Sequence, residues 1–420
     1  MVWRGRRCSL FLIMRTLFLL DIDCFFASVE MALHPELRGK PVCVGGRRGE
    51  RGIVACPNYE ARRYGVRTAM PVRTAERLLP PEAIFVRGSH HLYGEYSDRV
   101  MAILYDFTPD LEQVSVDEAY MDVTGCLHFW GGDAGAAVRM AAAIKEKIME
   151  RCALNVSIGI ASNKVCAKIA ATVGKPNGLV EVLCGREREF LAPLPVEVIP
   201  GVGSRTLPRL HARGIFTVAD LLKHRSGESS ALNRYLLAVA EGRDDRLIRT
   251  DRVEHSISRD TTFGHDRGDR DFILSTLYYL IERCCRTLRE RKQAASTITV
   301  KVRFTDFTTV QKQLTLACAT ACEQEFFVSA CHLLDGLLPP GRIIRLVGVK
   351  ASGLKSTGEG SQMEFGIMNR EKLDLLHRRV DALREKFGYT SIQWGLTVPL
   401  KRTFAASEEG YELHSPVYEL

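Results

Sequence analysis

The sequence lacks the features of secreted, membrane-spanning and repetitive proteins. Its 13 cysteines form no even framework and no C-x-x-C pair, which predicts reduced thiols in a cytoplasmic protein. No stretch of about 18 uninterrupted apolar residues is present, so no membrane span is expected. Internal repeats and low-complexity tracts are missing as well. What is left is an ordinary globular chain, whose 420 residues predict about two to four domains.

The N-terminus has the basic and apolar parts of a signal peptide without its cleavage site. Three arginines precede an apolar stretch, Arg15 interrupts that stretch, and no small-residue cleavage site follows. We expect residues 1–13 to be an extension, and the sequence leaves open whether Met1 or Met14 is the start.

One group of residues has ligands of the kind that zinc binds, namely Cys318, Cys322, Cys331 and His332. Cys318 and Cys322 lie at helical spacing in an Ala-rich stretch, which is typical of buried thiols. We therefore expect core cysteines there rather than a zinc site.

A pair of acids ends the first predicted strand. Residues 17–20 are apolar and predict a buried strand, and Asp21 and Asp23 share one face because strand side chains alternate. Two like charges side by side need a counter-charge. A divalent cation, an Arg or Lys partner, or helix N–H groups could each supply it.

A second acid pair, Asp117 and Glu118, lies inside another apolar stretch. Consecutive strand residues face opposite sides, so both acids serve one site only at a strand end or a bulge. Three or four carboxylates from separate strands can hold two Mg²⁺ ions for phosphoryl transfer. The alternative is that each acid caps a helix or pairs with an arginine.

Three further residues could contact phosphate groups. Tyr59 and Arg62 lie three positions apart on a predicted helix, where a hydroxyl and a guanidinium could grip a triphosphate. Lys175, before Pro-Asn-Gly, offers a usable ammonium group. The alternatives are a solvated basic helix face and an ordinary helix end.

Two motifs suit a nucleic-acid backbone, in line with a formal net charge of +8. Gly201 and Gly203 in "IPGVG" precede an apolar helix, and this stretch resembles a helix-hairpin-helix element. Pro208 is compatible with that element only if it lies in the first turn of the second helix. In "ITVKVRF", Lys301 and Arg303 lie on the polar face of a strand whose other face is apolar. The alternative for that strand is an ordinary half-exposed one.

Helices and strands interleave irregularly along the chain, which predicts an α+β fold rather than a doubly wound sheet. A helix is expected over residues 24–33, with Asp23 placed as its N-cap. Pro- and Gly-punctuated helices begin near residue 183, and residues 243–255 are charged and predict an exposed linker.

Taken in order, these motifs resemble those of the Y-family, translesion DNA polymerases, and most closely the bacterial DNA polymerase IV branch. The resemblance rests on "DIDCFFASVE", "NYEARRYGVRTAMP", "SVDEAYMDVTG", "NKVCAKIA" with "GKPNG", "IPGVG" and "RLVGVK", over residues 14–355. It implies a polymerase shaped like a right hand, with palm, fingers and helical thumb domains and a separate α/β little-finger domain. It also implies low-fidelity, template-directed synthesis from dNTPs onto a primer 3′-hydroxyl with two Mg²⁺ ions.

The resemblance also implies domain boundaries. They are an extension at 1–13, palm at 14–24 and 92–182, fingers at 25–91, thumb at 183–243, linker at 244–255, little finger at 256–355 and a C-terminal tail at 356–420.

By resemblance, Asp21, Asp117 and Glu118 are the metal-binding and catalytic triad, helped by the backbone carbonyl of Ile22. Asp23 is then the helix cap.

Tyr59, Arg62 and Lys175 match the triphosphate contacts by the same resemblance. Phe26 matches the steric gate, the ring beneath the incoming sugar, while Phe25 is expected to pack in the core.

"SQMEFGI" resembles a sliding-clamp-binding peptide, with Gln362, Met363 and Phe365 as anchors. The implied partners are primer-template DNA, dNTPs and the clamp, with no membrane, and the chain is expected to act as a cytoplasmic monomer.

Three other functions compete with this interpretation. A catalytically weak scaffold of the same fold that binds DNA or the clamp should have lost the carboxylates, which are all present. A nucleotidyl cyclase would not need the hairpin or the basic strand, and a repair factor using the hairpin alone leaves the acids unexplained.

Overall fold

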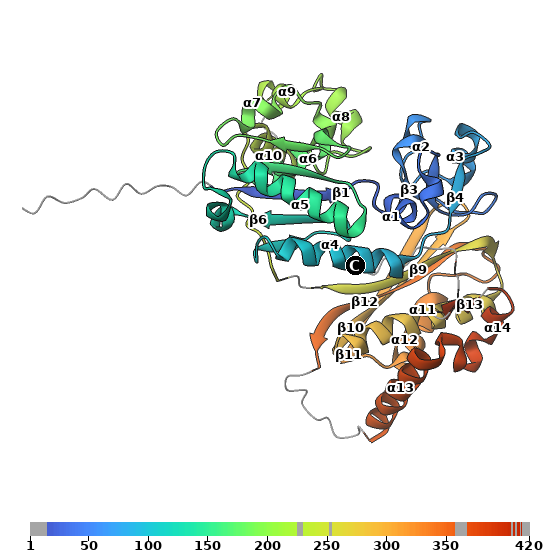
Figure 1. Ribbon diagram of the computed structural model, residues 1–420. Coiled ribbons are helices and arrows are strands. Elements are labelled where there is room, and N and C mark those ends of the chain that lie inside the picture. Colours follow the sequence, from blue (N-terminus) through green and yellow to red (C-terminus); the bar gives the residue numbers. More distant parts are fainter. Residues whose placement is uncertain are drawn as a thin grey trace, which may run out of the picture.

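The computed structural model describes residues 15–224, 230–251, 254–357 and 368–404, and positions 406, 407, 410, 411 and 413. Helices and strands are mixed throughout, which confirms the predicted α+β class (Figure 1). The clamp-binding anchors predicted at Gln362, Met363 and Phe365 lie outside the described residues. None of the helices in the described ranges is long and apolar enough to cross a membrane.

The central sheet has five strands in the order β5-β6-β1-β7-β8. β1 (Leu17–Ile22) lies in the middle and runs antiparallel to β6 (Glu118–Asp122) and β7 (Val156–Ala161). At the edges, β5 (Leu111–Gln113) forms a hairpin with β6, and β8 (Leu179–Glu181) runs parallel to β7. The apolar run before Asp21 is a buried strand, as predicted, and it is the central strand of this sheet.

Successive residues of β1 face two different cores. Phe18, Leu20 and Ile22 pack with helices α4 (His90–Tyr105) and α5 (Ala136–Cys152). Leu19 packs on the opposite face with α6 (Lys164–Gly174). A Cβ on Gly159, which pairs with Leu19, would lie 2.0 Å from the Ala167 carbonyl oxygen. Glycine at this position therefore lets α6 approach the sheet closely.

Residues after β1 build a smaller layer beside the central sheet. Its sheet has the order β3-β2-β4, with β2 (Val42–Gly45), β3 (Val54–Pro57) and β4 (Ile84–Val86). The helices are α1 (Phe25–Leu33), η1 (Pro35–Leu37), α2 (Tyr59–Arg63) and α3 (Val72–Leu78). Phe25 is 3% exposed and belongs to the core beneath α4, as expected.

Short helices follow the central sheet and share the core of α6. They are α7 (Glu187–Leu191), η3 (Val196–Val198), α8 (Leu207–His211), α9 (Val218–Lys223) and α10 (Ala231–Ala240). A further 3-10 segment, η2 (Thr124–Trp130), leads from β6 toward α5. Pro208 lies in the first turn of α8, the one place where the sequence allowed it.

The C-terminal part has an antiparallel sheet in the order β11-β10-β12-β9. Its strands are β9 (Ser256–Arg267), β10 (Gln293–Phe304), β11 (Thr309–Thr320) and β12 (Ile344–Ser356), and its helices are α11 (Arg270–Glu290) and α12 (Glu323–Asp335). Cys318 lies in β11 and Cys322 precedes α12, so the prediction of helical spacing for these two cysteines was wrong. Residues 309–320 instead pair with β10 as the second strand of a hairpin, and Cys318 and Cys322 are only partly buried.

The last described segment returns to α11. It contains α13 (Met368–Phe387), η4 (Tyr389–Ser391), η5 (Gly395–Thr397), α14 (Val398–Lys401), β13 (Ala406–Ser407) and β14 (Gly410–Tyr411). Tyr389, Leu400 and Tyr411 are buried in the core of the β9–β12 sheet. The sequence analysis expected a C-terminal tail over residues 356–420 and did not predict this packing.

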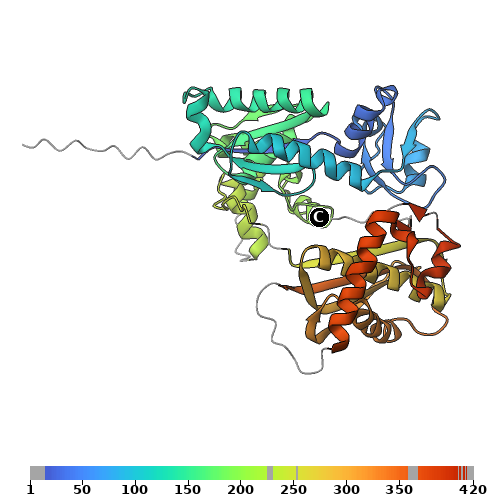
Figure 2. The same cartoon turned by 60° about the horizontal axis from the view of Figure 1, so that its bottom comes forward.

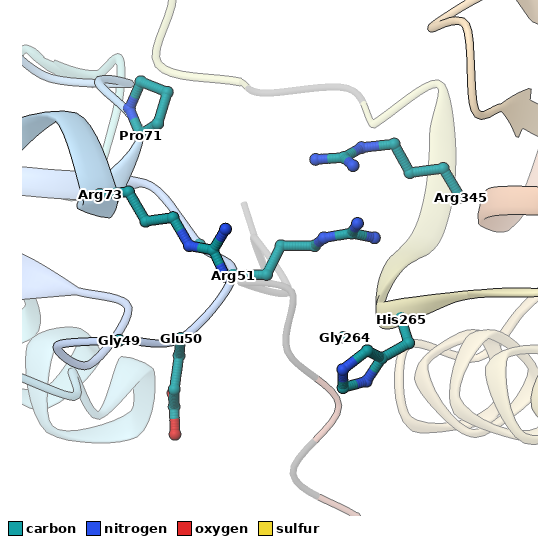
Figure 3. Close-up of a pocket in the computed structure, with 9 residues that line it drawn as sticks. Gly49, Glu50, Arg51, Pro71, Arg73, Gly264, His265 and Arg345 are labelled. Carbon is teal, nitrogen blue, oxygen red and sulfur yellow. The ribbon is translucent and has the colours of Figure 1, made fainter.

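The two halves of the molecule touch at one end, where the β3-β2-β4 layer approaches the β9–β12 sheet (Figure 2). Arg51 places Nη1 2.5 Å from Asp266 Oδ1 and 3.1 Å from the Phe263 carbonyl oxygen. A cavity of about 540 Å³ lies beside this contact. Figure 3 shows Arg51 and Arg345 extending into it from opposite sides.

Candidate active site

Three acids come together where β1 ends. Asp21 and Glu118 are direct partners in the antiparallel register of β1 and β6. Asp117 lies in the turn just before β6, and its carbonyl oxygen accepts from Ile22 N at 2.9 Å. A strand end was the geometry that Asp117 and Glu118 needed to serve one site. The structure therefore brings together all four residues predicted as the metal-binding set.

Two lysines supply the counter-charge in this structure. Lys175 Nζ lies 2.5 Å from Asp21 Oδ1, and Lys168 Nζ lies 2.6 and 2.7 Å from the two carboxylate oxygens of Glu118. Burial raises the pKa of Asp21 to about 6 despite Lys175, and the charges of Asp117 and Glu118 add to the rise. Within the described ranges, no three His, Cys, Asp or Glu side chains are arranged as a ready metal site.

The donor set nevertheless suits a hard cation. Three carboxylates and a backbone carbonyl are oxygen ligands of the kind that Mg²⁺ takes. The three acids also outnumber the two lysines, which leaves room for added positive charge. Lys175 and Lys168 have side chains that are 26% and 31% exposed, so each has space to move off its carboxylate.

Asp23 does not cap α1, and that prediction was wrong. The N-cap is Cys24, whose left-handed backbone (φ 45°) turns the chain between strand and helix. The buried Asp23 carboxylate instead accepts from Tyr59 Oη at 3.2 Å, from Ser157 Oγ at 3.0 Å and from Asn177 N at 2.6 Å. Asp23 thus joins α2, β7 and the turn after α6.

The predicted triphosphate contacts surround the same strand end. Tyr59 bonds to Asp23, and burial is the main reason that the pKa of its hydroxyl is raised. Arg62 donates from Nε to the Pro57 carbonyl at 3.1 Å and lies 5.3 Å from the Tyr59 ring centroid. Lys175 reaches the site from the turn after α6.

Phe26, the predicted gate, lies in the first turn of α1 and is partly buried. Its ring stacks on Tyr93 at a centroid distance of 4.3 Å and an interplanar angle of 13°. Tyr93 is itself held by a 2.6 Å hydrogen bond from its hydroxyl to Glu30. Sequence reasoning missed Tyr93 because it lies far from Phe26 along the chain.

The predicted DNA contacts differ in how they are presented. Gly201 and Gly203 are exposed, and Gly201 has φ +93°, a conformation that favours glycine. On β10, Lys301 pairs with Asp260, and Arg303 donates from Nε to Thr309 Oγ1 at 2.8 Å. The glycines therefore offer an open backbone, whereas the two basic side chains already have neighbouring partners.

Lys168 was also missed, although a signal for it was present. It lies one helical turn after Lys164 on the same side of α6, in the segment whose end leads into Lys175.

The fold and the site are those of a nucleotidyl-transferring polymerase. Three acids meet at the end of the central strand, the β3-β2-β4 layer lies beside that sheet, and the α7–α10 helices and a separate C-terminal sheet follow. The sequence matches the impB/mucB/samB family over residues 20–172, the C-terminal domain of that family over 254–365 and its HHH motif over 185–215. The chain belongs to this family, the Y-family DNA polymerases.

Individual relatives agree with this assignment. A DNA polymerase IV of Dehalococcoides mccartyi (strain CBDB1) is 42% identical over 91% of this chain and 98% of its own length. DNA polymerase IV 2 of Mesorhizobium japonicum is 36% identical over 94% of this chain and 96% of its own.

Solved structures give the same result. A Y-family DNA polymerase chimera of Dbh and Dpo4 has a TM-score of 0.72 at 30% identity, covering 81% of this chain and 99% of its own. The insertion ternary complex of Dbh DNA polymerase has a TM-score of 0.57 at 31% identity, covering 81% and 99%. The chain is thus a metal-dependent DNA-directed DNA polymerase of the translesion type.

Proposed function

We propose that the chain extends a primer on template DNA by transferring nucleotides from dNTPs to the primer 3′-hydroxyl, with two Mg²⁺ ions. The observation that carries the proposal is the meeting of Asp21, Asp117 and Glu118 at the end of the central strand. These side chains and the Ile22 carbonyl would hold the ions. When bound, two such ions activate the attacking hydroxyl and stabilise the leaving oxygen.

Tyr59, Arg62 and Lys175 would hold the triphosphate. The Tyr59 hydroxyl and the Arg62 guanidinium are neighbours on α2, and both can donate to phosphate oxygens. Lys175 now bonds to Asp21, so one ammonium group would exchange its carboxylate for a phosphate. Asp21 would then be available to hold a metal ion, and the Lys175 ammonium would keep an anionic partner.

The remaining predicted residues would handle the sugar and the DNA. Phe26 would exclude a 2′-hydroxyl by contact and by offering it no hydrogen-bond partner. Gly201 and Gly203 would let backbone N–H groups approach a DNA phosphate. Lys301 and Arg303 would follow the backbone of the duplex without reading bases.

We also propose the palm, fingers, thumb and little finger at the boundaries that the sequence implied. The central sheet, the β3-β2-β4 layer, the α7–α10 helices and the β9–β12 sheet support this division. Sliding-clamp binding at Gln362, Met363 and Phe365, a monomeric state and a cytoplasmic location remain proposals that rest on the family resemblance.

Primer extension with and without Mg²⁺ tests the function. Glu118→Gln should lower extension by about a hundredfold or more, because the lost charge serves the metal-bound transition state. Glu112→Gln is the matched control, since Glu112 also accepts from a lysine of α6 but lies outside the predicted metal set. Both variants should bind primer-template DNA like the unmodified protein.

Two results would count against the proposal. If Glu118→Gln extends primers at the normal rate, the metal assignment is wrong. If the unmodified protein binds DNA but shows no Mg²⁺-dependent extension, the alternative of a catalytically weak DNA-binding scaffold is correct.

A further inference from the structure

Lys168 bonds to both carboxylate oxygens of Glu118, at 2.6 and 2.7 Å. The Glu118 side chain is 12% exposed and that of Lys168 is 31% exposed. Water therefore reaches the Glu118 carboxylate poorly and the Lys168 ammonium partly, so their attraction is screened less than that of a fully exposed pair. The ammonium group lies where a cation held by both Glu118 oxygens would lie.

Lys168 belongs to a row of lysines along one side of α6. Lys164, one turn earlier, places Nζ 2.8 and 2.7 Å from the two Glu112 oxygens. Lys175, after the helix, bonds to Asp21. Two of these three acids, Glu118 and Asp21, belong to the predicted metal set, and Glu112 does not. The Lys164–Glu112 pair therefore serves as a control for the Lys168–Glu118 pair, because only the second pair includes a predicted metal ligand.

We propose that Lys168 is a positioning residue that holds Glu118 in the nucleotide-free enzyme and competes with the divalent cation for its oxygens. This inference rests on the proposed function, because it takes Glu118 as a metal ligand. An arriving triphosphate brings negative charge that attracts the ammonium groups and releases the carboxylates. Metal and nucleotide then bind cooperatively, and Lys168 sets part of that coupling.

Binding of Mn²⁺ to the nucleotide-free protein tests the competition. Mn²⁺ takes the same oxygen ligands as Mg²⁺, and its free concentration is measured by electron paramagnetic resonance. Lys168→Met removes the charge at similar length and should tighten Mn²⁺ binding by about tenfold, within the usual range of coupling between sites. Lys168→Arg and Lys164→Met should leave the Mn²⁺ dissociation constant within about twofold.

The coupling to nucleotide gives a second expected result. Adding a dNTP should tighten Mn²⁺ binding to the unmodified protein more than to Lys168→Met, because the variant no longer has that ammonium to displace. Unchanged or weaker Mn²⁺ binding by a folded Lys168→Met protein would overturn the proposal.

The unfolding temperature, measured with and without Mn²⁺, distinguishes a change in metal binding from a general loss of stability. Without metal, Lys168→Met leaves Glu118 without its cationic partner and should unfold at a lower temperature. Mn²⁺ should then raise the unfolding temperature of Lys168→Met more than that of the unmodified protein. If the lost stability is not regained with Mn²⁺, Lys168 is a structural residue only.

The Mn²⁺ titration does not depend on polymerase activity. Absence of primer extension by the unmodified protein would reject the proposed function and leave the binding result standing. Normal extension with no effect of Lys168→Met on Mn²⁺ binding would reject only the role of Lys168.

Discussion

The Phe26 ring has its orientation fixed by an aromatic neighbour. Stacking on Tyr93 at 4.3 Å, with the Tyr93 hydroxyl bonded to Glu30, holds the ring in the first turn of α1. Because the ring cannot move aside, a group as small as a 2′-hydroxyl would clash with it. Phe25, its neighbour, is buried and serves the core.

Phe26→Ala should raise ribonucleotide incorporation by about a hundredfold or more, if a few kcal/mol of clash is relieved. Deoxynucleotide incorporation should change less. Single-nucleotide incorporation rates with the two sugar types measure the effect, beside thermal unfolding. Phe25→Ala is the matched control, and it should destabilise the protein by about 3 to 5 kcal/mol and lower both rates together. A folded Phe26→Ala protein that still rejects ribonucleotides would move the gate to another residue.

The acids of the site show which residue roles could be predicted from the sequence and which could not. Alternation along the first strand predicted a shared face only for Asp21 and Asp23, and it was the family resemblance that grouped Asp21 with Asp117 and Glu118. The role of Asp23 was not predictable in detail, because it depends on the left-handed backbone at Cys24. Nor was the pairing of Lys168 with Glu118, because it depends on the close approach of α6 that Gly159 permits.

At the scale of elements, α13 is held against α11 and α12 by buried ion pairs. Arg384 Nη2 lies 2.6 Å from Glu282 Oε1, and the two side chains are 1% and 0% exposed. Arg289 contacts both oxygens of Asp381, at 2.6 and 3.0 Å. Polar residues such as these give a sequence pattern typical of an exposed helix, which is why the packing of the C-terminal segment was not predicted.

Arg384→Met should lower the free energy of unfolding by about 3 to 5 kcal/mol, because it leaves Glu282 buried without its partner. Arg378→Met, on the same helix, is the control. Arg378 pairs with Asp374 in an exposed position, with side chains 68% and 47% exposed, so its loss should cost less than about 1 kcal/mol. Urea unfolding of both variants decides the matter, and equal effects would contradict a role for burial.

His377 makes the same helix sensitive to pH. Burial alone would lower the pKa of His377, but contacts with Cys322 and Glu323 outweigh burial and raise the pKa from 6.5 to about 9. The folded state therefore holds this proton more tightly than the unfolded state. The stabilisation is fully present below pH 6.5 and is lost as the pH rises through about 9.

We expect the unmodified protein to have a larger free energy of unfolding than the His377→Gln variant. The difference should be up to about 3 kcal/mol at pH 6 and close to zero at pH 9.5. Urea unfolding of both proteins at the two pH values gives the difference directly. A difference that does not change with pH would show that His377 packs without binding an extra proton.

At the scale of the whole molecule, the β3-β2-β4 layer and the β9–β12 sheet meet through few contacts. The Arg51 and Asp266 side chains are 30% and 28% exposed, so water and salt weaken their attraction. The adjoining cavity is lined by Arg51, Arg73, Arg345 and His265. Glu50 is the one acid among the residues that line this cavity, so the three arginines exceed it in charge, and Asp266 offsets part of that excess through its pair with Arg51.

Asp266→Asn should loosen this contact. Fluorescence energy transfer between one label in the β3-β2-β4 layer and one on the β9–β12 sheet should show a longer and broader distance distribution. High salt should have the same effect on the unmodified protein. Asp133→Asn, which removes the exposed pair of Asp133 with Arg139 in the central part, should leave the distribution unchanged. Identical distributions for all three proteins would mean that other contacts fix the arrangement.

The division of β1 between two cores has an evolutionary consequence. Substitutions at Phe18, Leu20 and Ile22 must be accommodated by α4 and α5, whereas a substitution at Leu19 must be accommodated by α6 and the helices beyond it. Among relatives, adjacent positions of this one strand should therefore covary with different sets of partners. The alternation of a single strand thus lets two cores of the polymerase change separately, each with its own set of partners, while the acids at the end of the strand stay in place.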